Sequence, residues 1–191
     1  MLPGDPHSQL PGHARRYDRA MLGQGWQSQW ERVQRRLDDV RAVYTGRPGG
    51  TDAAIDTVQS FFEAVHHLKD WLGNDPSSGI TKAVGDKLIN GSLVLQLCAD
   101  LANGSKHLAL TSSRTGDRST RIARNDVTVF PGTAWGSAAM GTRRPSAPAT
   151  TGMSAHRFYV ASAGTEYDVL QLAEDATAEW HKFLSSQGLI S

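Results

Sequence analysis

The sequence predicts a mainly α-helical fold: a four-helix bundle, with a small β-hairpin or sheet and a flexible loop inserted before the last helix. Three observations lead to this prediction. Apolar residues recur at spacings of three and four in four separate stretches. Glycine and proline separate those stretches. Residues 108–170 instead show alternating patterns and a long tract with few large side chains.

The first helix is predicted from Trp26 to Tyr44, where a large apolar residue recurs at about every turn and charged residues lie between. It should end before residues 46–50, which hold three glycines and a proline. Residues 1–25 are rich in proline and glycine and lack the apolar run of a secretory signal, so we expect a flexible leader there. A chain of 191 residues then leaves one domain, over residues 26–191.

A second helix, capped by Thr51 or Asp52, is expected to end near Gly73. A short helical piece should follow over residues 80–89, and Ser92 is placed to cap a third helix. The residues expected to face the core from these helices are Val58, Phe61, Val65, Leu68, Leu72, Val94, Leu97, Cys98 and Leu101.

The pattern changes in the insertion, residues 108–170. Residues 108–111 and 122–130 are typical of strands, and residues 131–155 form a Gly, Ala, Ser, Thr and Pro tract that we expect to be disordered. Residues 157–162 and 165–170 alternate around Ala163-Gly164, which predicts a β-hairpin. The last helix should then begin with Asp168 and Gln171 as a capping pair.

Arginine is concentrated in the insertion. Residues 108–157 hold seven arginines against two aspartates, whereas the whole chain has a net charge of only +1. Such clustering is typical of segments that attract nucleic-acid phosphates. The predicted nucleic-acid contacts are Arg114, Arg118, Arg121 and Arg124.

The composition of the chain bears on its cellular location and on the kinds of site that it can hold. No apolar run approaches the ~20 residues of a membrane-spanning helix, so no membrane partner is expected. Cys98 is the single cysteine, which excludes an intramolecular disulfide and a cysteine-based zinc site. These observations predict a cytoplasmic protein.

Two helices carry matched polar stripes. Glu63, His66 and Asp70 share one flank of the second helix, and Asp100, Asn103 and His107 repeat that spacing on the third. A histidine beside a carboxylate can act as general acid or base, and a cation such as Lys106 can neutralise a phosphate. The predicted catalytic set is His107, Asn103, Lys106, His66, Asp70 and Asp100.

Two other interpretations of these stripes remain open. Polar residues on half-exposed helix flanks commonly satisfy backbone groups or one another. Glu63 and His66 also form one Glu-x-x-His pair of the kind that di-iron bundles use twice, but no second pair is present. We therefore expect no metal and no cofactor.

Residues 103–107, Asn-Gly-Ser-Lys-His, resemble a motif of the HEPN superfamily of small helical bundles, in which an arginine and a polar residue precede a histidine. Asn103 and His107 match, while Ala102 stands in the arginine position. The resemblance implies a metal-independent endoribonuclease of a toxin–antitoxin or anti-phage system, with RNA and an antitoxin as partners. The alternative is a non-catalytic module that binds nucleic acid or protein, and a homodimer remains open.

Overall fold

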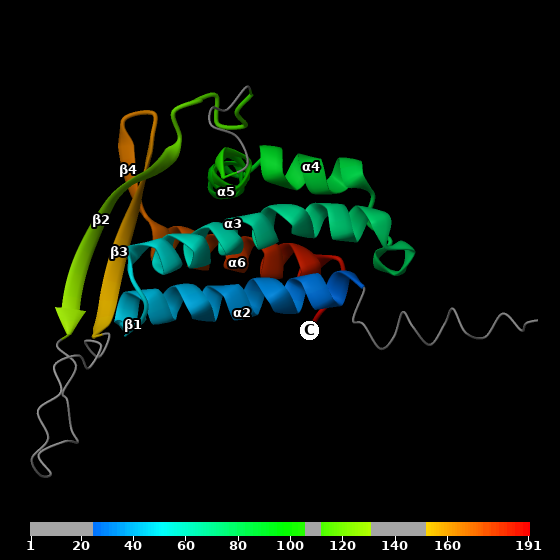
Figure 1. Ribbon diagram of the computed structural model, residues 1–191. Helices are drawn as coiled ribbons and strands as arrows, with labels where there is room; N and C mark the ends of the chain where they lie inside the picture. Colours follow the sequence, from blue (N-terminus) through cyan, green and yellow to red (C-terminus); the bar gives the residue numbers. More distant parts are fainter. Residues whose placement is uncertain (1–24, 106–111, 131–151) are drawn as a thin grey trace, which may run out of the picture.

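The structure, a computed structural model, describes residues 25–105, 112–130 and 152–191 (Figure 1). Over these ranges it is mainly helical with a small antiparallel sheet before the last helix, so the predicted fold class is confirmed at this level. The elements are α2 (Trp26–Thr45), β1 (Arg47–Pro48), α3 (Thr51–Asn74), the 3₁₀ helix η1 (Pro76–Ser78), α4 (Lys82–Asn90), α5 (Leu93–Gly104), β2 (Arg121–Phe130), β3 (Met153–Ser162), β4 (Thr165–Asp168) and α6 (Val169–Ser186). The strand predicted over 108–111 lies outside the described residues, as does nearly all of the leader and most of the 131–155 tract.

Helix α2 follows its apolar ridge as predicted. Trp26, Trp30, Val33, Leu37 and Val40 are all buried, because residues three and four apart share one face of the helix. The helix ends at Gly46, which has a φ of 104° and whose N–H donates to the carbonyl of Ala42 at 3.0 Å. A positive φ is easily adopted only by glycine, which explains the stop.

Helix α3 begins differently from the prediction. Its N-cap is Gly50, which is extended and makes no side-chain hydrogen bond, so the expected cap by Thr51 or Asp52 is wrong. Both residues already lie in the first turn, where the carboxylate of Asp52 faces the positive end of the helix dipole. The helix ends at Asn74, one residue after Gly73 and two before Pro76, which agrees with the predicted end near Gly73.

The two helices that follow are separated by a capped turn. Helix α4 begins two residues later than predicted, because Thr81 is still extended as its N-cap. The predicted cap of α5 is confirmed: the hydroxyl of Ser92 accepts a hydrogen bond from the N–H of Leu95 at 3.1 Å. Cys98 is buried in α5, and this burial raises the pKa of its thiol, so the thiol stays protonated.

Strand β3 is the centre of the sheet. β2 pairs with one edge of β3, while β1 and β4 pair with opposite ends of the other edge, all antiparallel. Residues 153–155 belong to β3, so the expected disordered tract extends too far. They pair with β2 and with Arg47–Pro48, and a partner so distant in the sequence leaves no local signal.

The predicted hairpin is confirmed. Ala163 and Gly164 join β3 to β4 with φ angles of 48° and 78°, and consecutive positive φ angles fit the twist of the strands. β4 ends at Asp168, two residues before the predicted end, because the Asp168 carboxylate accepts from the N–H groups of Leu170 and Gln171 and starts α6. The Gln171 side chain donates to Asp175 instead, so the capping pair is only half formed.

Buried apolar side chains from the helices and from β3 form one cluster. Trp180 of α6, Phe61 and Phe62 of α3, and Phe158 of β3 are the largest residues that are fully buried. Helix α2 packs on α3, α6 and β3, and α3 also packs on α4, α5 and α6. Within the described ranges, no helix has the length and apolar character needed to cross a membrane.

Candidate functional site

The polar stripe of α3 meets the end of α5 at one contact. The carboxylate of Glu63 accepts a hydrogen bond of 2.7 Å from the hydroxyl of Ser105, the residue that caps α5. Ser105 also donates to the carbonyl of Ala102 at 2.9 Å. The chain that leads to His107 therefore starts beside the α3 stripe. His107 and Lys106, two members of the predicted catalytic set, lie outside the described residues.

Asp100 lies in a different environment from the half-exposed flank that its spacing predicted. It is completely buried. Its carboxylate accepts four hydrogen bonds of 2.6–3.0 Å: from the Ser113 hydroxyl, from the Arg114 N–H, and from the N–H and hydroxyl of Thr115. A buried charge is tolerated when it is hydrogen-bonded in this way. Asp100 thus anchors the loop before β2 to α5, and this structural role accounts for its buried carboxylate.

His66 is held in its neutral form. Burial, with a smaller contribution from the nearby charges of Lys69 and His67, lowers its pKa to about 4, although Asp70 acts in the opposite direction. Its Nδ1 atom is buried and accepts no hydrogen bond from the described residues. A base is most effective when its pKa is near the working pH. His66 is therefore better suited to accept a hydrogen bond as a neutral imidazole than to transfer a proton at pH 7.

Asp70 belongs to a charged cluster between α3, α4 and the loop before β2. Lys69 Nζ lies 2.7 Å from the Asp70 carboxylate and 3.7 Å from that of Asp86 on α4. Arg114 donates to Asp86 at 3.1 Å and to the Asn90 side-chain oxygen at 2.6 Å. The predicted phosphate contact Arg114 is therefore engaged within the protein, where it holds the loop against α4.

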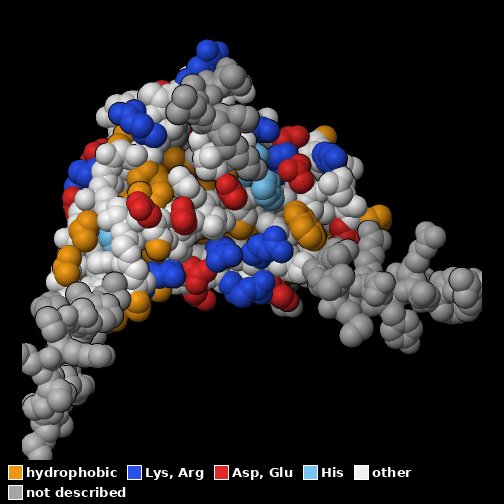
Figure 2. Space-filling view, in the orientation of Figure 1, with side chains coloured by type: hydrophobic (Ala, Val, Ile, Leu, Met, Phe, Trp, Pro, Cys, Tyr) orange, Lys and Arg blue, Asp and Glu red, His pale blue; other side chains and the backbone are white. Residues whose placement is uncertain are grey.

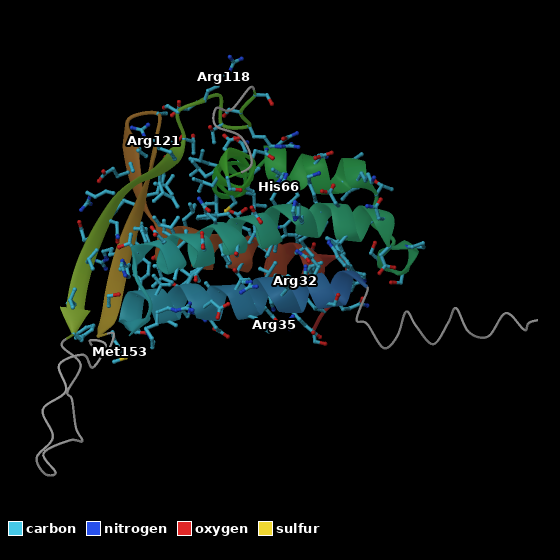
Figure 3. All side chains as sticks on the ribbon, in the orientation of Figure 1. Arg32, Arg35, His66, Arg118, Arg121 and Met153 are labelled. Atoms are coloured by element: carbon cyan, nitrogen blue, oxygen red, sulfur yellow. The ribbon has the colours of Figure 1, made fainter. Side chains whose placement is uncertain are left out.

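The two arginines of β2 differ in whether they pair with a carboxylate of the protein. Arg124 stacks over the ring of Tyr159 at 3.6 Å and pairs with Asp126 and Glu166 at 2.6 and 3.3 Å. Arg121 is exposed, and its guanidinium donates to the backbone carbonyl of Ser119. Arg118 is also exposed and projects from the loop before β2 (Figure 3). Within the described ranges, neither Arg118 nor Arg121 contacts a carboxylate.

The remaining predicted site residues lie at the end of α5. Asn103 is half-buried, and Ala102, in the position of the family's arginine, is buried. The contact that joins the α3 stripe to the end of α5 is made by Glu63 and Ser105, which are not in the predicted catalytic set. The structure directs Asp100 and Arg114 into loop anchoring. Among the described residues, no group of three His, Cys, Asp or Glu side chains is arranged to hold a metal ion.

A basic surface on α2 was not predicted. Figure 2 shows Lys and Arg side chains gathered over α2, with Asp and Glu side chains along the neighbouring α3. Arg32, labelled with Arg35 in Figure 3, lies over the ring of Trp71. Arg35 pairs with Glu31, and Arg36 pairs with Asp39. The signal in the sequence was the run of arginines at 32, 35 and 36, which falls on the polar side of an amphipathic helix.

A buried hydrogen-bonded chain in the sheet was also not predicted. Ser154 donates to the carbonyl of Gly49 at 3.0 Å, and His156 Nε2 lies 2.9 Å from the Ser154 hydroxyl. His156 Nδ1 lies 3.1 Å from the amide of Asn125. Because the Ser154 proton goes to Gly49, the histidine donates through Nε2 and accepts through Nδ1. Burial lowers the pKa of His156, and the chain ties β3 to the segment before α3.

Comparison of the chain with protein-family models, curated proteins and solved structures found no match.

Proposed function

We propose that this chain binds RNA, and that Arg118 and Arg121 contact its phosphates. One observation carries the proposal: these two exposed guanidinium groups have no carboxylate partner among the described residues, whereas Arg114 and Arg124 do. An arginine that is already paired within the protein gains little from a phosphate, because its existing pair must first be broken. An arginine without a carboxylate partner can bind a phosphate and release counterions from RNA without breaking an ion pair.

The choice of RNA rests on the HEPN resemblance. The sequence pattern also predicts a four-helix bundle, and we take α2, α3, α5 and α6 as its helices. Their packing supports this assignment, since α3 contacts α2 and α5, and α6 contacts all three others. The buried Ala102 leaves no side chain for a phosphate at the family's arginine position. On this proposal, Arg118 and Arg121 supply the positive charge from the neighbouring loop and strand.

The test compares two double variants that remove the same charge. Arg118→Gln with Arg121→Gln removes the unpaired arginines, and Arg124→Gln with Arg157→Gln removes arginines that pair with carboxylates on the sheet. The probe is a labelled single-stranded RNA of about 20 nucleotides, titrated by fluorescence anisotropy at several salt concentrations. Each lost phosphate contact should reduce the salt slope by about 0.7, so the first variant should lose about 1.4. Salt-independent binding by the parent, or equal losses in both variants, would contradict the proposal.

Cleavage of RNA is the second candidate, and the contact between Glu63 and Ser105 favours it. That contact fixes the end of α5, two residues before His107, against the carboxylate of Glu63 on the helix that also carries the neutral His66. On this candidate His107 acts as general acid or base towards the ribose 2′-hydroxyl, and Lys106 neutralises the phosphate. The ribonuclease would then serve the toxin–antitoxin or anti-phage role that the resemblance implies.

Replacing His107 separates cleavage from binding. His107→Ala should reduce cleavage of labelled RNA about 100-fold or more, because proton transfer contributes about 10²–10⁴ to the rate. Affinity for the RNA should be nearly unchanged, and EDTA should have no effect on the parent. Salt-dependent binding by the parent without any cleavage would leave the binding function alone.

A further inference from the structure

The exposed large apolar side chains of the described residues come from two parts of the fold, the β2–β3 pair and the helices α4 and α5. Within the described ranges, the large hydrophobic residues with an exposed side chain are Val84, Leu93, Val127, Val129, Phe130 and Met153. The last four lie on β2 and at the start of β3, towards the end of the sheet where Phe130 pairs with Met153, which Figure 3 labels. Val84 lies on α4 and Leu93 at the start of α5.

Val84 lines a groove between α4 and α6. The groove has a volume of about 590 Å³, which is within the ~300–1,000 Å³ typical of binding clefts. Val84, Leu88 and Phe183 form its apolar surface, and Gly91 and Ser92 close it at the turn into α5. Helix α4 packs on α3 and α5, and α6 packs on α2, α3 and α5, so the groove lies between two helices that are each held from other sides.

The lining residues have the spacing of helix-packing faces. Helix α4 contributes Val84, Lys87, Leu88 and then Gly91 at its C-cap, and α6 contributes Glu179, Lys182, Phe183 and Ser186. Both sets follow i, i+3, i+4 and i+7, the positions that face a neighbouring helix. Each set spans about 10 Å along its axis, or two turns. The groove is therefore lined on both sides by residues with the spacing of a helix-packing face.

The charges around the groove favour an incoming helix that carries carboxylates. Lys87 and Lys182 are exposed, and neither has an ion-pair or hydrogen-bond partner among the described residues. Glu179 is the one carboxylate of the lining, so the two lysines outnumber it. An incoming helix with carboxylates beside its apolar stripe would pair with both lysines, and a basic helix would be repelled.

We propose that this groove binds an amphipathic α-helix of a partner protein, with apolar residues at i, i+3, i+4 and i+7 and with Glu or Asp flanking them. The apolar residues fill the space over Val84, Leu88 and Phe183. The flanking carboxylates pair with Lys87 and Lys182. The site uses none of the arginines assigned to RNA, so the two surfaces can be tested separately.

The probes are three labelled, hydrocarbon-stapled helical peptides of about 14 residues, or four turns. The acidic peptide has Leu at i, i+3, i+4 and i+7 and Glu on both sides of that stripe. The basic peptide has Lys for every Glu, and the polar peptide has Ser for every Leu. Anisotropy titration of the full chain should give a Kd below about 100 µM for the acidic peptide and at least about tenfold weaker binding for the other two.

Charge reversal at the two lysines locates the binding. Lys87→Glu with Lys182→Glu should weaken the acidic peptide by about tenfold or more and strengthen the basic one, because both interactions change sign. Lys82→Glu is the matched control, since Lys82 is an exposed lysine of α4 outside the groove lining. All three lysines are exposed, so these variants should keep the thermal stability of the parent, which circular dichroism checks.

Three results would overturn the proposal. The first is equal affinity for acidic and basic peptides, and the second is an equal loss of binding in the Lys82 control. The third is a concentration-dependent dimer of the parent that the double reversal dissociates, which would make a second copy of this chain the occupant of the groove. The RNA titration of the double reversal should match the parent whichever result is obtained.

Discussion

The hydroxyl of Tyr44 bonds both backbone groups of Phe158: it donates to the carbonyl at 3.0 Å and accepts from the N–H at 3.2 Å. Phe158 lies on the edge of β3 between the residues that pair with β1 and those that pair with β4. The tyrosine thus takes the place of a strand in this gap. Burial raises the pKa of Tyr44 to about 12, so the donated proton is retained at physiological pH.

Tyr44→Phe should lower the free energy of unfolding by about 1–3 kcal/mol, because buried backbone groups of β3 lose their partner. The Tyr44 hydroxyl also accepts a hydrogen bond of 3.1 Å from the N–H of Leu170. In the variant this N–H keeps a second acceptor, the carboxylate of Asp168. Urea unfolding measures the change. Tyr167→Phe is the control, since the Tyr167 hydroxyl makes no hydrogen bond to any described residue. Equal losses in the two variants would show that the gap in the sheet needs no such tie.

Asp100→Ala should be more damaging, with a loss of about 2–4 kcal/mol, because four donors in and beside the loop before β2 lose one common acceptor. Ser113→Ala removes one of those donors and should cost about 1 kcal/mol. Urea unfolding gives both values, and limited proteolysis should cut the loop faster in the Asp100 variant. A wild-type unfolding midpoint for Asp100→Ala would refute the anchoring role.

The lowered pKa of His66 predicts that the free energy of unfolding falls as the solution is acidified. Its pKa is lowered from 6.5 to about 4 in the folded protein, so between these values the unfolded chain binds a proton that the folded chain does not. Stability from this group is complete above pH 6.5 and decreases towards pH 4, by up to about 3 kcal/mol. His66→Gln should therefore lose less stability than the parent between pH 7 and pH 4.5 in urea titrations. Parallel curves for the two proteins would exclude the effect.

The β3–β4 turn offers a stabilising change. Ala163 has a φ of 48°, which costs about 1 kcal/mol in a residue with a β-carbon, whereas asparagine tolerates this region well. Ala163→Asn should raise the free energy of unfolding by about 0.5–1 kcal/mol, and Gly164→Ala, at a φ of 78°, should lower it by a similar or larger amount. Thermal unfolding checks both. A lower melting temperature for Ala163→Asn would contradict the turn geometry.

Sequence periodicity was sufficient to predict the helix boundaries that depend only on neighbouring residues. The ridge of α2, the stop at Gly46 and the cap at Ser92 depend on residues within one or two turns, so they could be predicted. The start of α3 could not, because Gly50 takes the cap position with no side chain to mark it. Residues 153–155 were misjudged for a related reason, since their strand pairs with residues 47–48 and with β2.

The candidate site was harder to predict, because one residue type serves several roles. The spacing of Glu63, His66 and Asp70 correctly placed them on one face of α3, but it could not reveal that Ser105 would bind Glu63. Asp100 matched the same pattern and is buried under a loop that lies 13–15 residues further along the chain. The arginines look equivalent in the sequence, and only their tertiary neighbours separate Arg118 and Arg121 from Arg114 and Arg124.

The link from Tyr44 to Leu170 spans 126 residues, which has a consequence for protein synthesis. At about 5–20 residues per second, a ribosome needs roughly 6–25 seconds to make the intervening chain. During that interval α2 can pair with α3 and then α5 can join them, but the part of the α2 ridge that faces β3 and α6 stays uncovered. This uncovered strip is the surface on the nascent chain where a chaperone would have most time to bind.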